Sequence, residues 1–522
     1  MRIKLALSSF QWLDSRLCWE VTMSLLALFI FSCILQKLTH KGPMSWPIMG
    51  IIPSVFLHIN NIYDWVTESL IEAGGTFHFR GVWMGGYYGI VTLDPSNIEY
   101  MLKTKFKNFP KGTYYRERFY DLLGNGIFNV DDELWKEQRR IATSEMHSRR
   151  FVQHSFQNMN DLVHQKLLRV VQKLVESGVS FDFQEVLFRF TFDNICTVAF
   201  GVDPGCLSLD LPEVPFATAF EEAAELTLVR FIVPPFVWKP MRYFGIGYEK
   251  RLKEAIKIVH HFAEKTLARR KNDRIESNDR SDLLSRLIEH SEVEKRGDFS
   301  DKLLRDFCIS FILAGRDTTS VALAWFFWLV DKNPEVENRI LCETNDILGH
   351  RKCHTDLDNV VFTVEELEKM VYLQAALSES LRLYPSVPID FKEAIEEDVL
   401  PDGTMVRSGA RVFYSLFSMA RMESIWGKDC LEFKPERWIK DGQFVTESQF
   451  KYPVFNAGPR LCLGKKFAYL QMKMVAVSIL LRFQVKVVEG HKVDPKLTTT
   501  LYMKHGLRVT LKPRLVTTAE CH

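Results

Sequence analysis

The stretch from Phe455 to Gly464, FNAGPRLCLG, limits the fold more than any other part of the chain. Gly458 and Gly464 allow a tight turn and let the backbone approach a flat surface closely. Cys462 lies just before a helix expected from Lys465 onward, and the positive end of that helix would stabilise a thiolate. The loop therefore predicts a cysteine sulfur that is presented from a turn toward a bound group.

Cys462 is one of ten cysteines, and none of the ten belongs to a C-x-x-C pair. This distribution is neither a disulfide framework nor a zinc site. Arg460, two residues before Cys462, can hold a carboxylate. A flat ligand with a metal at its centre and carboxylates at its edge is haem, and thiolate ligation favours O–O cleavage. The alternative is a buried structural cysteine in a turn.

Reduced to F-x-x-G-x-R-x-C-x-G, this loop resembles the haem-binding loop of cytochromes P450, a family of haem-thiolate monooxygenases, and the resemblance covers essentially the whole chain. It implies a mainly α-helical fold with small β-sheets (α+β) in a single large haem domain. It also implies that Cys462 is the axial ligand of the iron of haem b and that Phe455 shields the sulfur. Arg460, Gly458 and Gly464 complete the cofactor-binding set in this loop.

A long helix is expected from Ser300 to Asp331, with Ser300 as its N-cap. Its middle reads AGRDTT, and a threonine there can bond back to the helix backbone and open room beside a hydroxyl and a carboxylate. The stretch resembles the family's oxygen-handling signature, which implies a proton-relay role for Thr318 and Asp317. The alternative is a small-residue helix crossing, with Asp317 in a surface ion pair.

The two residues that precede Arg316 in this signature, Ala314 and Gly315, are expected on the cofactor side. Some relatives that hydroxylate fatty acids carry a Glu at the position of Ala314 and attach haem covalently. Since alanine cannot form such a bond, the sequence predicts non-covalent haem.

An E-x-x-R pair, Glu379 and Arg382, falls on one face of a helix. The resemblance adds Arg437 and implies that the three residues form a buried ion network with a role in architecture. An i,i+3 surface pair is the alternative reading.

A W-x-x-x-R pattern, Trp135 to Arg139, resembles the family's haem-propionate site. Arg140 adjoins it, so the assignment between the two arginines stays open by one place. Lys392 lies where relatives often have a further propionate partner.

An uncharged apolar run from Val21 to Leu35 is the strongest membrane signal in the sequence. With its edges it gives an anchor at about 21–38 within an N-terminal region 1–40. A proline-containing connector, 41–50, and a haem domain, 51–522, follow. A cleaved signal peptide is the rival reading, although no small-x-small cleavage site follows the run. The resemblance implies an endoplasmic reticulum membrane protein with its catalytic domain facing the cytosol.

Strand character is expected at the two ends of the haem domain. We expect a hairpin over Thr76–Leu93 and strands over Met405–Phe417 and Thr498–Leu511. Surface loops are expected over Arg270–Arg280 and His350–Asp358.

Three stretches, FGVDPGCLS, AGRDTTSVALAWFFWL and LYMKHGL, resemble the plant fatty-acid ω-hydroxylase group, and within it the very-long-chain branch. This implies oxidation of the terminal carbon of long- or very-long-chain fatty acids, for monomers of suberin- or cutin-type polyesters. Apolar walls are expected from Leu122–Phe128, the helix before Gly315, Val387–Ile389 and Thr498–Met503. Arg118 and Arg230 are two candidates for holding the carboxylate, and the choice stays open.

Electrons must come from a partner, which the resemblance identifies as NADPH–cytochrome P450 reductase, with O₂ as co-substrate. A basic docking face could form from Lys451, Lys465, Lys466 and Lys473. The formal charge, +2 from 67 basic and 65 acidic residues, provides no global field for nucleic acid.

Two other functions fit a haem-thiolate protein. One is an isomerase or dehydratase of lipid hydroperoxides, and the other is a non-enzymatic haem sensor or lipid carrier. The acid–hydroxyl pair, Asp317 and Thr318, favours O₂ chemistry over both.

Overall fold

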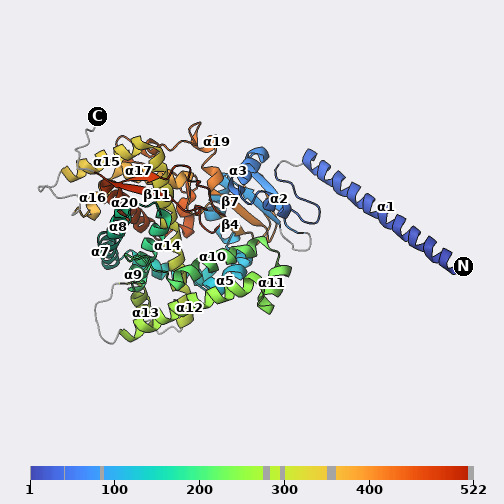
Figure 1. Ribbon diagram of the computed structural model, residues 1–522, viewed down its shortest axis with the longest axis horizontal. Coiled ribbons are helices and arrows are strands. Elements are labelled where there is room, and N and C mark those ends of the chain that lie inside the picture. The colour runs from blue at the N-terminus through green and yellow to red at the C-terminus, as the bar shows by residue number, and fades with distance from the viewer. Residues whose placement is uncertain are drawn as a thin grey trace.

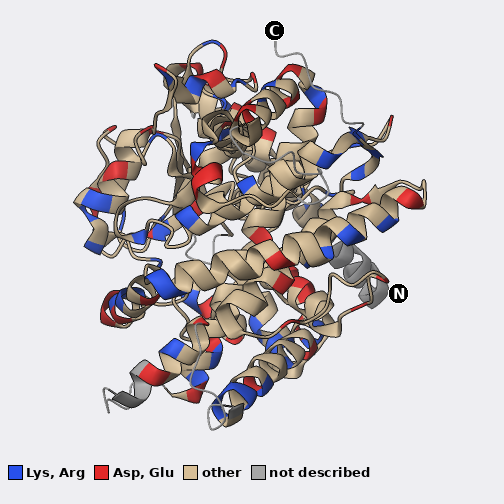
Figure 2. Ribbon diagram, turned by 90° about the vertical axis from the view of Figure 1, so that its left-hand side faces the viewer, with Lys and Arg blue, Asp and Glu red and all other residues tan. Residues whose placement is uncertain are grey.

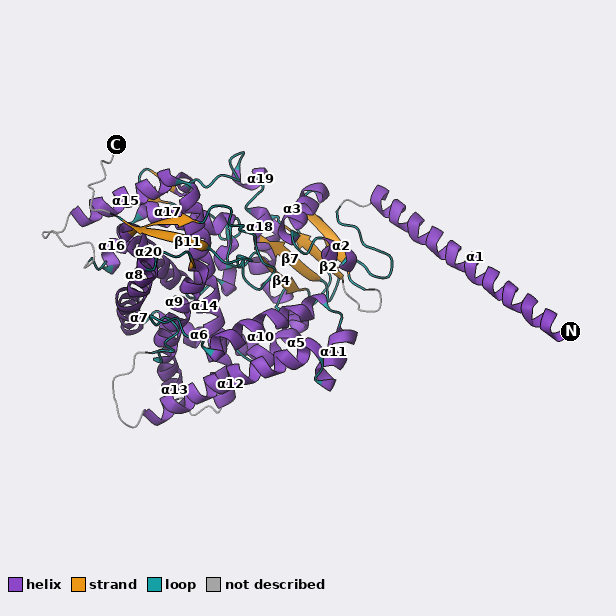
Figure 3. Ribbon diagram, viewed as in Figure 1, coloured by secondary structure: helices purple, strands orange, loops and turns teal. Residues whose placement is uncertain are grey.

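The computed structural model describes residues 2–39, 42–82, 88–273, 282–293, 300–349 and 360–514. Helices dominate the body, and the strands gather into small sheets (Figure 3). The α-helices are α1 (Arg2–Thr39), α2 (Ile52–Leu57), α3 (Ile62–Ala73), α4 (Pro95–Glu99), α5 (Gly112–Leu123), α6 (Asp132–Met146), α7 (Arg149–Leu162), α8 (Leu168–Glu176), α9 (Phe183–Phe200), α10 (Pro215–Ile232), α11 (Pro235–Phe244), α12 (Gly247–Asp273), α13 (Leu283–Val293), α14 (Asp301–Lys332), α15 (Pro334–Gly349), α16 (Val364–Lys369), α17 (Val371–Leu383), α18 (Leu416–Met419), α19 (Glu423–Trp426) and α20 (Lys465–Arg482).

Two sheets carry most of the strands. The larger has the order β1-β2-β7-β4, in which β2 and β7 are parallel and the other pairs antiparallel. The smaller has the order β10-β11-β3. The strands are β1 (Thr76–Arg80), β2 (Tyr88–Thr92), β3 (Phe181–Asp182), β4 (Ile389–Glu393), β5 (Asp398–Val399), β6 (Met405–Val406), β7 (Arg411–Ser415), β8 (Ile439–Lys440), β9 (Gln443–Phe444), β10 (Phe483–Val487) and β11 (Arg508–Pro513).

The strand predictions were right in part. The hairpin is present as β1 and β2. The strand expected over Met405–Phe417 is divided into β6 and β7, which belong to different sheets. It ends at Ser415, because the Ser415 side chain accepts a hydrogen bond from the Ser418 backbone N–H and starts α18. The strand expected from Thr498 begins only at Arg508. Before it, local side-chain bonding from Thr498 to the Thr500 carbonyl competes with a ladder.

Helix α14 crosses the body and is buried along most of its length. The side chain of Ser300 accepts a hydrogen bond from the Leu303 backbone N–H, so the predicted N-cap is correct. Helices α9, α12, α17 and α20 pack against α14. The contact with α20 places α14 close to the loop that precedes α20.

Helix α1 projects from the body next to α2 and α3 (Figure 1). Within it, Arg16–Thr39 has a mean hydropathy of 2.0 and none of that window is buried. Helix α14 is also long and apolar enough to cross a membrane, but 78% of its window is buried, which marks a core helix. The exposed helix is therefore a candidate anchor.

The described part of the connector is non-helical, as expected, but it folds against the body. Trp46 and Gly50 exchange backbone hydrogen bonds, and Trp46 Nε1 donates to Ser54 Oγ at 3.0 Å. The N–H of Ile51 then donates to the Arg80 carbonyl at 2.7 Å. The chain therefore joins the body at the edge of β1.

Basic and acidic residues are interspersed along the helices in the side view (Figure 2). The loop expected over Arg270–Arg280 begins later, because α12 continues to Asp273, and Arg270 Nε donates to the Phe200 carbonyl at 2.6 Å. The rest of that loop and the one expected over His350–Asp358 lie outside the described residues.

Candidate active site

A cavity of about 1560 Å³, counted to its open mouth, lies between α14 and the loop before α20. Cys462, Leu463 and Gly464 form one wall. Residues of α14, including Ala314, Gly315, Thr318 and Thr319, contribute another. The segments predicted to bind one cofactor, about 150 residues apart in the sequence, therefore share a single cavity.

The cysteine loop is held in shape by its own backbone. The N–H of Cys462 donates to the Phe455 carbonyl at 2.8 Å, and the N–H of Leu461 donates to Gly458 at 3.0 Å. Gly458 has φ +60°, and a Cβ there would overlap the Leu102 carbonyl oxygen. Glycine is required at this position both by the conformation and by the space available. Helix α20 begins at Lys465, directly after the cysteine turn.

The thiol of Cys462 is open to the cavity, which itself lies deep in the protein. Burial raises the pKa of the Cys462 thiol. The Gly464 backbone N–H and the charges of Arg139 and Lys465 act in the opposite direction and favour the thiolate. A backbone N–H and two cations beside an accessible sulfur are the groups that would favour the thiolate form, which is the form that binds a metal ion.

Two arginines, Arg139 and Arg460, line the cavity that contains the Cys462 sulfur, as predicted for the carboxylate-binding edge of the cofactor site. Arg139 donates to the Leu461 carbonyl, which brings its guanidinium to the cysteine loop. Arg460 pairs with Asp131 at 2.5 Å, and its guanidinium carbon lies 4.2 Å from the centre of the Trp135 ring. Trp135, Arg139 and Arg460 all line the cavity.

Lys392 has a different environment from the one its sequence match implied. Its ammonium donates to Asp390 at 2.7 Å and to the Tyr414 hydroxyl at 3.3 Å. The lysine that lines the cavity is Lys111, which lies at the start of α5 and has no motif around it. Burial lowers the pKa of Lys111 to about 7.

Asp390 was also missed, although it lines the cavity. Burial opposes its ionisation, but Lys392 and Lys111 lower the pKa of Asp390 to about 2, so it is a carboxylate at neutral pH. The one sequence signal was the spacing of Asp390 and Lys392, which puts both on the same face of a strand.

The α14 signature has the expected local geometry. Thr318 Oγ1 donates back to the Ala314 carbonyl at 2.7 Å. A Cβ on Gly315 would approach Ile195 to 2.6 Å, so glycine lets α9 pack closely. Asp317 is buried and lies outside the described residues that line the cavity. Its Oδ1 accepts from Arg316 Nη1 at 3.0 Å, and burial raises the pKa of Asp317.

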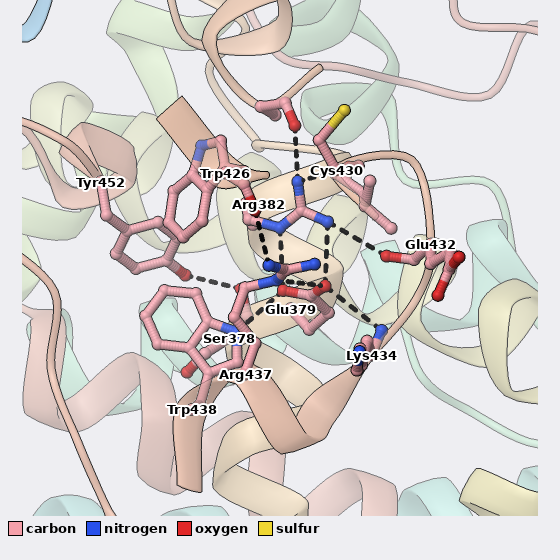
Figure 4. A network of polar contacts seen from close by, with 12 residues as sticks. Ser378, Glu379, Arg382, Trp426, Cys430, Glu432, Lys434, Arg437, Trp438 and Tyr452 are labelled. Atoms are coloured by element: carbon pink, nitrogen blue, oxygen red, sulfur yellow. Dashed lines mark hydrogen bonds and ion pairs between the residues drawn. The ribbon is translucent and has the colours of Figure 1, made fainter. Parts of the chain in front are cut away.

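Glu379, Arg382 and Arg437 form a buried network (Figure 4). Arg382 donates to both carboxylate oxygens of Glu379, at 2.8 and 2.9 Å. Arg437 Nε and Trp438 Nε1 add bonds of 3.3 and 2.8 Å. The carboxylate therefore joins α17 to the segment around Trp438, and none of the four residues is among the described ones that line the cavity.

Two further interpretations of basic residues need correction. Lys473 is buried and donates to the Leu367 carbonyl at 2.8 Å, so it contributes nothing to a docking face. Arg230 is also buried and pairs with Glu249 at 2.6 Å and with Asp121 at 2.9 Å. Its charge is matched within the protein, which leaves it unsuited to holding a substrate carboxylate.

Some of the residues expected to form the substrate walls line the cavity, and others do not. Ile127, Phe128 and Val387 line the Cys462 cavity. Ile389 lines a different cavity. The Thr498–Met503 segment lies outside the described residues that line either one.

The cavity fits haem in its donor set: a sulfur on one wall, small side chains of α14 on another, and cations at its edge. Cys462 would hold the iron, and Trp135, Arg139, Arg460 and Lys111 would hold the propionates. When bound, this group supplies the activation of O₂.

Comparison with known proteins supports the interpretation of this cavity as a haem site. A family model described as Cytochrome P450 matches residues 41–513. The chain is 53% identical to "Cytochrome P450 86B1" of Arabidopsis thaliana, over 95% of this chain and 90% of that protein. It is 37% identical to "Alkane hydroxylase MAH1" of the same plant, over 92% and 96%. It is 35% identical to "Noroxomaritidine synthase 2" of Narcissus pseudonarcissus, over 95% and 97%.

The match extends over nearly the whole chain, and the cysteine loop that gave the first indication of a haem-thiolate protein lies inside it. The chain belongs to the cytochrome P450 family and is a monooxygenase of mainly α-helical fold with small β-sheets.

Proposed function

We propose that this monooxygenase inserts one oxygen atom from O₂ into the terminal carbon of long- or very-long-chain fatty acids. The observation that carries this proposal is a largely apolar cavity whose lining includes both Cys462 and Thr318. The relative named as an alkane hydroxylase supports an unbranched hydrocarbon as the reacting part of the substrate. Monomers of suberin- or cutin-type polyesters are the products that we expect.

Cys462 would hold the haem iron in this proposal, and Phe455, Gly458 and Gly464 shape its loop. Thr318 and Asp317 deliver protons. Thr318 lines the cavity, and the acid next to it in the sequence, Asp317, is buried and paired with Arg316. Since burial raises the pKa of Asp317, a proton can reside there.

Haem b binds without a covalent link in this proposal. Ala314 has only a methyl group, and the carboxylate among the described residues lining the cavity, Asp390, is already bonded to Lys392 and Tyr414. Arg139, Arg460 and Trp135 hold the propionates. Lys111 takes the role that the sequence assigned to Lys392.

Selectivity for a terminal methyl requires a shape that admits only the end of a chain. The side chains that would provide this shape are Phe128, Val387 and Phe311 of α14, which line the cavity together with Ala314 and Thr318.

NADPH–cytochrome P450 reductase supplies the electrons in this proposal, on the endoplasmic reticulum membrane. Region 1–40 anchors the chain, 41–50 connects it, and 51–522 is the haem domain that faces the cytosol. Lys466 is exposed and Lys465 half-buried at the start of α20, so both can contribute to docking.

The test is to incubate membranes containing the protein and a reductase with fatty acids of graded length. Mass spectrometry of the products locates the new oxygen. We expect terminal alcohols that require both NADPH and O₂. Rearranged hydroperoxides formed without NADPH would favour the isomerase, and ligand binding without any product would favour a sensor or carrier.

A further inference from the structure

Asn456, the residue after Phe455 in the cysteine loop, has a backbone conformation that is unusual for a residue with a side chain. Its φ is +60° and its ψ is −173°. Glycine occupies this region almost exclusively, and another residue stays there only when its surroundings hold it. The contacts of the Asn456 side chain therefore need to be accounted for.

The side-chain amide of Asn456 bonds in two directions. Its Oδ1 accepts from the Ala457 backbone N–H at 2.8 Å, within the cysteine loop. Its Nδ2 donates at 3.3 Å to Oδ2 of Asp390 in β4, 66 residues away in the sequence. Because a carboxylate can only accept, the amide nitrogen is the atom that must face Asp390. The amide therefore bridges the cysteine loop and β4.

The carboxylate at the far end of this bridge is firmly held. Oδ2 of Asp390 also accepts from Lys392 at 2.7 Å and from the Tyr414 hydroxyl at 2.5 Å. Lys392 and Tyr414 are each only 1% exposed, and Asp390 lies opposite Tyr414 in the pairing of β4 with β7. Asn456 thus attaches the cysteine loop to a fixed point of the larger sheet.

The backbone of Asn456 also controls the turn that presents the cysteine. Since a peptide unit is planar, φ of Asn456 sets the direction of the Phe455 carbonyl relative to the rest of the loop. That carbonyl accepts from the Cys462 N–H at 2.8 Å. A rotation at Asn456 would therefore move the acceptor that holds the backbone of Cys462.

From these contacts we propose that Asn456 is a positioning residue for Cys462. Its amide ties the cysteine loop to Asp390 and keeps the Phe455 carbonyl in the direction that fixes the sulfur on its wall of the cavity. This inference rests on the role of Cys462 in the proposed function and deepens it, because it names a residue that shapes the ligand loop before haem binds.

Two substitutions of Asn456 test the bridge. Asn456→Asp keeps the size of the side chain but sets a second carboxylate against Asp390, so that repulsion should push the cysteine loop away from β4. Asn456→Gly removes the amide and leaves the backbone unstrained. Asn108→Asp is the matched control, because Asn108 Nδ2 donates to Asp398 at 3.0 Å and neither residue is among the described ones that line the Cys462 cavity.

Two measurements on the full-length protein follow the sulfur without requiring turnover. One is the fraction of the reduced carbon monoxide complex that has the long-wavelength Soret band of thiolate ligation. The other is the rate at which haem transfers to excess apomyoglobin. In both Asn456 variants we expect at least about tenfold more of the form without the thiolate band and at least about tenfold faster haem transfer, because a charge-assisted bond is lost. Asn108→Asp should match the wild type.

Wild-type spectra and transfer rates in the Asn456 variants would overturn the positioning role, and so would equal changes in Asn108→Asp. Should Asn456→Asp fail to fold, Asn456→Gly decides alone. If the wild type itself lacks the thiolate band, the role of Cys462 fails and this inference fails with it. If the wild type has the band but forms no terminal alcohol, the proposed substrate fails, and the variants still decide the role of Asn456.

Discussion

Removing the charge of Glu379 should destabilise the protein strongly. Glu379 is fully buried and accepts bonds from the side chains of Arg382, Arg437 and Trp438. Glu379→Gln preserves the size of the side chain but leaves the Arg382 guanidinium, itself 1% exposed, without its carboxylate. Breaking a buried pair in this way costs about 3–5 kcal/mol, against a total stability of about 5–15 kcal/mol.

The assay is urea denaturation of the full-length protein in detergent, followed by near-ultraviolet circular dichroism. Glu436→Gln is the matched control, because Glu436 pairs with Arg339 at the surface, where the two side chains are 42% and 54% exposed. Such a pair contributes about 0–1 kcal/mol. Equal and small decreases in the free energy of unfolding in the two variants would refute the stabilising role of the Glu379 network.

Three further changes test individual residues. Gly458→Ala should cost at least about 3 kcal/mol and lower haem content in absorbance spectra, because φ is +60° and the Leu102 carbonyl blocks a Cβ. Gly349→Ala, where nothing lies within 4 Å of the added Cβ, should keep both the stability and the haem content near wild type. Lys473→Met should stabilise by about 2 kcal/mol at pH 7 in urea titrations. Burial lowers the pKa of Lys473 from 10.5 to about 8, a penalty of about 3.4 kcal/mol that the substitution removes, and the lost hydrogen bond to the Leu367 carbonyl offsets about 1.5 kcal/mol of this gain. The gain should fade between pH 8 and 10.5 as the folded wild type loses the proton, and a pH-independent gain would contradict this. Thr318→Ala should lower the amount of product formed per NADPH consumed at least about tenfold and should release peroxide, both measured in the same reaction. An unchanged ratio of product to NADPH would exclude a proton-relay role for Thr318.

The cysteine loop and α14 could be predicted because their signals are local. Ser300 caps a helix within three residues of itself, and Gly458 sets a turn that places Cys462. The Glu379–Arg382 pair was likewise readable from helical spacing.

The rest depends on contacts between distant segments. Lys111 reaches the cavity because the backbone of α5 is held by Asp131, twenty residues away. Arg118 and Arg230 were candidates for holding a substrate carboxylate, yet each donates to the backbone carbonyl of the other, 112 residues away in the sequence. The strand expected from Thr498 is absent at that end for the opposite reason. There a local hydrogen bond, from the Thr498 hydroxyl to the Thr500 carbonyl, takes the place of pairing with a neighbouring strand.

The central claim is that Cys462 ligates haem iron as a thiolate. The most direct measurement is the absorption spectrum of the reduced protein with carbon monoxide, for the wild type and for Cys462→Ser. We predict a Soret band at the long-wavelength position that marks thiolate ligation, and its loss in the variant. Persistence of that band in Cys462→Ser would contradict the assignment.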